Sequence, residues 1–174
     1  MPRISVWATG MAMTAASGLV IAAVTMSAAA AAPWCGTESL QLSTGPVRTT
    51  EYVGQDQLDV ILTNISGQSC ALQGYPGVDL VGPDDPMWGP VFSLRRASGD
   101  SRPFTLAPGA SAASILSFVG PATGDRWVPT SIVVTPPDAT TQLQVPWISD
   151  DYAVLRQDGA THPGSYIGPL QLTD

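Results

Sequence analysis

Apolar and polar residues alternate in short runs along most of the chain. Leu58, Val60 and Leu62 share one face of a run whose other positions are mainly polar, which is the pattern of a half-buried strand. Similar runs recur between clusters of Gly, Pro, Asn and Asp, the residues that favour turns. The pattern predicts strands at 40–43, 58–64, 70–72, 78–81, 91–95, 104–106, 114–119, 131–135, 141–145, 152–156 and 166–172.

This succession of short strands predicts an all-β fold, and specifically an immunoglobulin-like antiparallel β-sandwich. With 16 Pro and 17 Gly in 174 residues, no window is both long enough for a capped helix and amphipathic at a helical period. Pro146 and Pro169 fall within such runs and indicate edge strands or strand ends. No Trp lies between Cys35 and Cys70, so the domain is not of the antibody type.

The first 31 residues have the features of a cleaved secretory signal peptide. Arg3 is the only charged residue before Glu38, and a long apolar run ends in small residues. Cleavage fits best after Ala30 or Ala31, which leaves residues 32–174 as a single domain. Because the run 10–32 is long enough to cross a bilayer, an uncleaved anchor helix is the alternative.

The expected export predicts that the two cysteines form a structural disulfide. Cys35 and Cys70 are the only cysteines of the chain, and in an oxidising compartment an even count favours a disulfide. The bridge would close a loop of about 36 residues, which lowers the entropy of the unfolded chain by the equivalent of roughly 4 kcal/mol. It would attach the N-terminal segment to the chain that follows the strand at 58–64.

Three sequence blocks resemble those of a known family. They are Thr63-Asn64-x-Ser66-Gly67-x-x-Cys70-x-Leu72-x-Gly74-Tyr75-Pro76-Gly77 within residues 60–80, and the later blocks 106–112 and 134–137. Together they resemble an uncharacterised family of secreted actinobacterial proteins, classified as a domain of unknown function. The resemblance implies an immunoglobulin-like sandwich, export and a Cys35–Cys70 bridge, but no activity. A second cysteine pair that is common in the family's C-terminal half is absent here.

Charge and composition narrow the classes of function. The chain has 14 acidic and 7 basic residues, a formal net charge of −7 and a pI near 4.3, which argues against nucleic acid and anionic lipid as partners. All basic residues are Arg, so chemistry that depends on Lys is excluded. Only 12% of residues are charged and the mean hydropathy is +0.16, values that do not fit a disordered chain.

The sequence gives little support for a catalytic site or a metal site. A serine hydrolase would combine Ser101, within Gly99-Asp100-Ser101, with Asp158 and the single histidine, His162. Esterases with a comparable motif need an α/β fold, which these strands do not supply. Two thiols and one His are too few for a zinc site, and Asp84-Asp85 and Asp150-Asp151 do not form a calcium loop. No metal or cofactor is expected.

The aromatic residues are the best candidates for binding. Trp88 lies in a Pro-rich loop where burial in the core is not required, and Tyr75 lies in a turn; exposed aromatics of this kind commonly contact glycans or proteins. Trp127 and Trp147 lie beside strands and are expected in the core. Strand alternation places the Arg95 and Arg96 side chains on opposite faces.

These observations predict an exported protein of unknown biochemical activity. The favoured role is a non-enzymatic binding or structural module, secreted or held in the cell envelope. Its partner would be an envelope glycan or protein, not nucleic acid, and not a membrane unless the N-terminal helix is retained. The alternatives are a small secreted serine hydrolase and a membrane-tethered domain.

Overall fold

The computed structural model describes residues 31–124 and 126–173 of the chain. The predicted signal peptide and its cleavage, like most of the alternative anchor helix, concern residues outside this part. Within it, the only helical element is a short 3-10 helix, η1 (Thr37–Ser39). None of the helical residues described forms a segment that is long and apolar enough to cross a membrane.

Strands dominate the described residues and form three sheets, so the predicted all-β class is confirmed. The largest sheet has the order β1-β3-β9-β12-β7, with β2 beside β3 and β13 beside β9. Its strands are β1 (Leu40–Thr44), β2 (Arg48–Thr49), β3 (Gln55–Asn64), β7 (Arg95–Arg96), β9 (Ser111–Val119), β12 (Tyr166–Ile167) and β13 (Gln171–Leu172).

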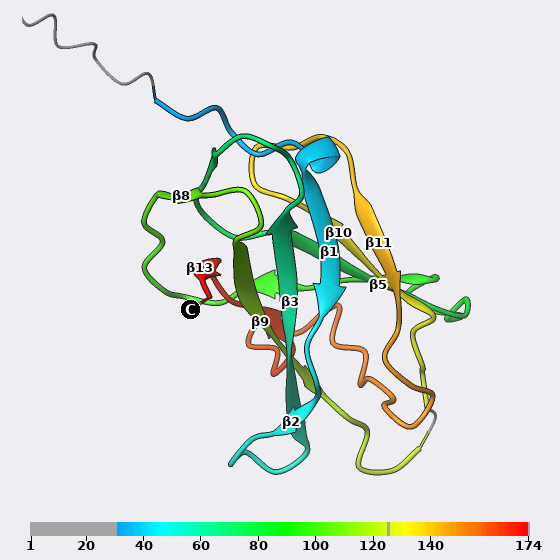
Figure 1. Ribbon diagram of the computed structural model, residues 1–174. Helices are drawn as coiled ribbons and strands as arrows, with labels where there is room; N and C mark the ends of the chain where they lie inside the picture. Colours follow the sequence, from blue (N-terminus) through cyan, green and yellow to red (C-terminus); the bar gives the residue numbers. More distant parts are fainter. Residues whose placement is uncertain (1–30, 125, 174) are drawn as a thin grey trace, which may run out of the picture. The chain divides into compact units, whose positions relative to one another are not determined.

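The second sheet has four strands in the order β11-β10-β5-β6. They are β5 (Gly77–Val81), β6 (Val91–Ser93), β10 (Ser131–Thr135) and β11 (Leu143–Pro146), and a third, two-stranded sheet pairs β4 (Cys70–Leu72) with β8 (Phe104–Leu106). Figure 1 shows β1, β3 and β9 side by side, with β10, β11 and β5 forming a separate layer. Every pairing of strands is antiparallel except that of β12 with β7.

The two larger sheets enclose one hydrophobic core. In β3, Leu58, Val60 and Leu62 are fully buried while the residues between them are partly exposed, as the alternation predicted. Leu80 of β5 and Ile132 of β10 belong to the same buried cluster. Because each sheet buries only one face, the apolar positions of both meet in this shared core.

Most predicted strands are found within a few residues of their expected bounds. The run 91–95 is not one strand, because β6 and β7 belong to different sheets, and the run 166–172 is divided into β12 and β13. The strand predicted at 152–156 is wrong. In this run the structure has a single isolated β-bridge, between Val154 and Trp127. The backbone N–H of Val154 donates to Trp127 O, whereas that of Leu155 donates to Val119 O. Since consecutive residues bond to different segments, no regular ladder forms. Pro146 ends β11, an edge strand, as expected.

The predicted disulfide between Cys35 and Cys70 is present. The N-terminal segment runs beside β4, where Trp34 forms a parallel bridge with Ala71. The N–H of Cys35 donates to Ala71 O at 3.0 Å, and the N–H of Ala71 donates to Pro33 O at 2.7 Å. The covalent bond and the backbone hydrogen bonds therefore fasten the same segment to the same short strand.

Asn64, at the end of β3, connects three parts of the backbone through its buried side chain. Its Nδ2 donates to Gln68 O at 2.8 Å and to Leu106 O at 2.9 Å. Its Oδ1 accepts from the backbone N–H and the hydroxyl of Ser66, at 2.9 and 2.7 Å. The side chain thus shapes the turn after β3 and links it to β8, which explains the Asn and the Ser of the Asn-x-Ser-Gly sequence.

Replacing Asn64 by Ala is expected to lower the free energy of unfolding by about 3 kcal/mol, because it leaves a buried carbonyl and an N–H group without partners. Urea unfolding of the oxidised domain measures this. Gln68→Ala is the matched control, since that side chain is exposed and only its backbone carbonyl is used. A loss below about 0.5 kcal/mol for Asn64→Ala would contradict the role given to this residue.

Candidate binding site around Trp88

Residues 82–90, called the Trp88 loop below, connect β5 to β6 and carry the main candidate for binding. The loop is closed at its base, where the N–H of Gly82 donates to Pro90 O at 2.9 Å. Nearer its tip, Asp85 and Gly89 exchange two backbone hydrogen bonds of 3.2 and 2.8 Å. Gly89 has φ +72°, a conformation that side-chain-bearing residues rarely adopt.

The carboxylate of Asp85 fixes the tip of the loop. Its Oδ1 accepts hydrogen bonds from the backbone N–H groups of Met87 and Trp88, each at 2.9 Å. These two bonds hold the pKa of Asp85 below its ordinary value, with a smaller contribution from the positive charge of Arg156. The carboxylate is therefore ionised at neutral pH. It fixes the backbone N–H groups of Met87 and Trp88.

Arg156 holds the loop from the other side. Its Nη1 donates to Gly89 O at 2.8 Å, and its Nη2 donates to Val91 O at 2.9 Å and to Trp88 O at 3.3 Å. The guanidinium also forms a two-pronged pair with Asp158, through Nε at 2.8 Å and Nη2 at 2.7 Å. Only 6% of the Arg156 side chain is exposed, so this nearly buried cation depends on these partners.

Two aromatic rings complete the surroundings of the guanidinium. Its central carbon lies 4.6 Å from the ring centroid of Trp127 and 5.4 Å from that of Phe92, within the range of cation–π attraction. Trp127 in turn donates from Nε1 to Pro83 O at 2.9 Å. The base of the loop is therefore fixed to the same residues that hold Arg156.

The loop presents two large apolar side chains to the outside. Met87 is 77% exposed and Trp88 is 45% exposed, although both amide groups are fixed by Asp85. The Cη2 atom of Trp88 lies above Gly159, where an added Cβ would be only 3.5 Å away. Trp127 and Trp147 are buried instead, as the sequence predicted.

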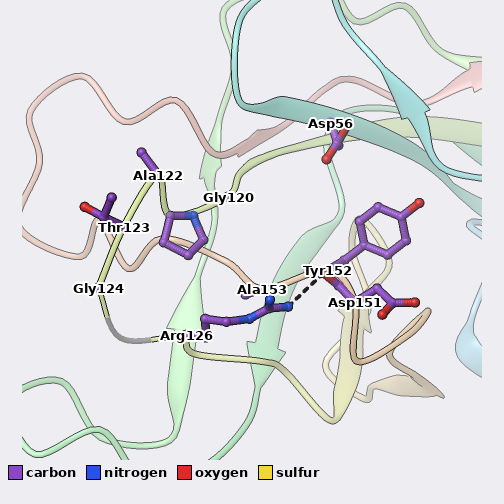
Figure 2. Close-up of a pocket in the computed structure, with 10 residues that line it drawn as sticks. Asp56, Gly120, Ala122, Thr123, Gly124, Arg126, Asp151, Tyr152 and Ala153 are labelled. Carbon is purple, nitrogen blue, oxygen red and sulfur yellow. Dashed lines mark hydrogen bonds between the residues drawn. The ribbon is translucent and has the colours of Figure 1, made fainter.

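Two open hollows flank Arg126 beside the loop. One, of about 330 Å³, lies between the carboxylates of Asp84 and Asp85 and the Leu155 side chain. The other, of about 320 Å³, is shown in Figure 2, where Asp56, Asp151 and Tyr152 lie on the side opposite the segment from Gly120 to Gly124. Arg126 lines both hollows and donates from Nη2 to Asp151 O at 3.0 Å. The lining of the first hollow therefore combines acidic residues, the cation of Arg126 and the exposed apolar residue Leu155.

Tyr75, the second residue predicted for binding, does not share this site. It precedes β5, whereas the Trp88 loop follows it, so the two residues lie at opposite ends of the strand. Tyr75 donates from its hydroxyl to Gly99 O at 2.8 Å. That hydrogen bond holds the segment between β7 and β8 against the start of β5.

The three residues predicted for a hydrolase have separate surroundings in the described part of the chain. Asp158 pairs with Arg156, and Nδ1 of His162 is 3.2 Å from the hydroxyl oxygen of Thr161. The hydroxyl oxygen of Ser101 is buried and has no hydrogen-bond partner there. Across the described ranges, no three His, Cys, Asp or Glu side chains gather into a group suited to a metal ion.

Sequence reasoning missed Arg156 and Arg126. The partners of Arg156 lie up to 68 residues away, at 88–91 and at 127. No spacing along the chain reveals such a set, because it is produced by the packing of the Trp88 loop against the C-terminal segment.

These observations define the class of protein. It is an all-β domain with one disulfide and a loop whose backbone is held by hydrogen bonds and which exposes an aromatic side chain. Residues 35–168 match a family described as a domain of unknown function (DUF4232). Because the match covers most of the chain, the protein belongs to this family. A comparison with curated proteins found no match.

Arg156→Ala is expected to lower the free energy of unfolding by about 3 kcal/mol, because Asp158 and three carbonyls lose a nearly buried partner. Arg48→Ala is the matched control: Arg48 also forms a two-pronged pair, with Asp59, but its side chain is 45% exposed. Loss of the Arg48 side chain should lower the free energy of unfolding by less than about 1 kcal/mol. Equal losses in urea unfolding would show that Arg156 has no special part in stability.

Proposed function

We propose that the protein is an exported, non-enzymatic binding module that acts outside the cell or in its envelope, with Trp88 as the main contact residue. The observation that carries this proposal is the fixed conformation of an exposed aromatic loop. Both the tip and the base of the Trp88 loop are hydrogen-bonded before any partner arrives. A loop whose backbone is already ordered loses little conformational entropy on binding.

The fold and the disulfide support the rest of the proposal. Two mainly antiparallel sheets contribute to one core. The chain passes from one of these sheets to the other between β3 and β5, β6 and β7, β9 and β10, and β11 and β12. This arrangement supports an immunoglobulin-like sandwich. The Cys35–Cys70 bridge supports an oxidising compartment, and therefore export. The route that we propose is a signal peptide at 1–31, in an actinobacterial cell.

The partner that this site fits best is a glycan or a protein of the envelope. Trp88 offers a flat apolar surface, and the adjacent hollow offers the carboxylates of Asp84 and Asp85 together with Arg126. Aromatic stacking combined with charged hydrogen-bonding groups suits both kinds of partner. A membrane-tethered form would have the same site at a different location. No contact among the described residues favours the hydrolase.

Trp88→Ala is expected to weaken binding to envelope fractions by about thirtyfold, as for an interface residue worth roughly 2 kcal/mol. The oxidised mature domain would be sedimented with purified cell walls and with membranes of the organism that encodes it. Trp34→Ala is the matched control, because Trp34 is 51% exposed but lies beside Cys35 instead of in the Trp88 loop.

Retention of the native domain and of Trp34→Ala, with loss for Trp88→Ala, would support the proposal. Absence of retention for all three proteins would contradict envelope binding. Equal losses for both tryptophan variants would contradict the assignment to the Trp88 loop.

A further inference from the structure

A third hollow, with no residue of the Trp88 loop in its lining, contains basic and hydroxyl groups. It has a volume of about 550 Å³ and shares no lining residue with the hollows beside Arg126. Its polar lining consists of Arg95, Arg96, Ser98, Thr161, His162 and Tyr166.

The walls of this hollow are held together by backbone pairing. Strand β12 lies parallel to β7, with Tyr166 opposite Arg95 and Ile167 opposite Arg96. The N–H of Ala97 extends this contact by donating to Ile167 O at 2.9 Å. The residues on both sides are therefore positioned by the sheet, although the lining groups themselves lie at its edge.

Both arginines line the same hollow, although strand alternation is expected to place their side chains on opposite faces of β7. Arg95 and Arg96 are each exposed, and both line the cavity. Strand β7 is only two residues long and lies at the end of the sheet. Since nothing in the sheet continues beyond this edge, two long, flexible side chains are not separated by a packed layer.

The hollow is a local concentration of positive charge in an acidic protein of net charge −7. In the part of the chain that the structure describes, the ion pairs are Arg48–Asp59 and Arg156–Asp158. Neither Arg95 nor Arg96 has a side-chain hydrogen bond within 31–124 and 126–173. Among the residues that the structure describes, no carboxylate lines the hollow. Its guanidinium groups are thus suited to an anion supplied by a ligand.

We propose that this hollow binds a phosphoryl group carried on a sugar or polyol. Two guanidinium forks match the several oxygens of a phosphate group, and the hydroxyls of Ser98, Thr161 and Tyr166 are further donors. The volume of about 550 Å³ leaves room for the carrier beside the phosphate. A polyanion such as nucleic acid is disfavoured, because the net charge of −7 would repel it outside this hollow.

The site goes beyond the proposed function, since it involves neither Trp88 nor its loop. A test is an NMR titration of the oxidised domain with inorganic phosphate, with glycerol 3-phosphate and with glycerol. Saturable shifts at 95–98 and 161–166 are expected with both phosphates and not with glycerol. Glycerol 3-phosphate should bind more tightly than inorganic phosphate, because the carrier also contacts the hollow.

Matched variants assign the effect to this hollow. The double substitution Arg95→Gln and Arg96→Gln should weaken binding of glycerol 3-phosphate roughly tenfold or more. Arg102→Gln should not, because Arg102 is an exposed arginine that does not line the hollow. His162→Ala leaves β7 intact and should weaken binding several-fold, which tests the site even if the double variant folds poorly. Trp88→Ala should bind normally, so this site and the proposed function are tested separately.

Three results would overturn the proposal. The first is the absence of saturable shifts with either phosphate. The second is an equal loss in Arg102→Gln, which would indicate a non-specific effect of charge. The third is an equal affinity for inorganic phosphate and glycerol 3-phosphate, which would remove the sugar or polyol carrier from the proposal.

Discussion

The nearly buried guanidinium of Arg156 is the interaction on which the candidate binding site depends. It connects the Trp88 loop, the buried ring of Trp127 and the carboxylate of Asp158. A buried cation is costly unless its donors are satisfied, so all these partners must be in place together. A lysine could not replace it, because an ammonium lacks the planar, five-donor geometry that serves a carboxylate and several carbonyls at once.

This arrangement separates the stabilising residues from those available for contact. Asp85 and Arg156 fix the backbone of the Trp88 loop, and Trp127 fixes its base. The side chains of Met87 and Trp88 remain exposed. A surface with this division of roles can recognise a partner without first ordering a loop.

The sequence blocks that resemble the family serve the fold more than the site. Asn64 links the turn after β3 to β8, Cys70 fastens the N-terminal segment, and Tyr75 holds the segment after β7. All three belong to the block at 60–80, whereas the Trp88 loop follows it. The resemblance therefore describes a scaffold and leaves the nature of the binding partner open to experiment.

Local pattern predicted most of the strands, because alternation such as that of Leu58, Val60 and Leu62 reflects one buried face. It failed at 152–156, where consecutive backbone groups bond to different segments. The disulfide could be predicted from an even number of cysteines in a chain that was expected to be exported. Arg156 could not be predicted in the same way, because its partners come together only through the tertiary fold.

The binding role requires that the Trp88 loop is ordered before it meets a partner. The NMR order parameter of the backbone amide of Trp88 in the unbound native domain, compared with those of β3, measures this order. We expect values near 0.85 for both, typical of rigid backbone. A value below about 0.6 for Trp88, with β3 rigid, would contradict it.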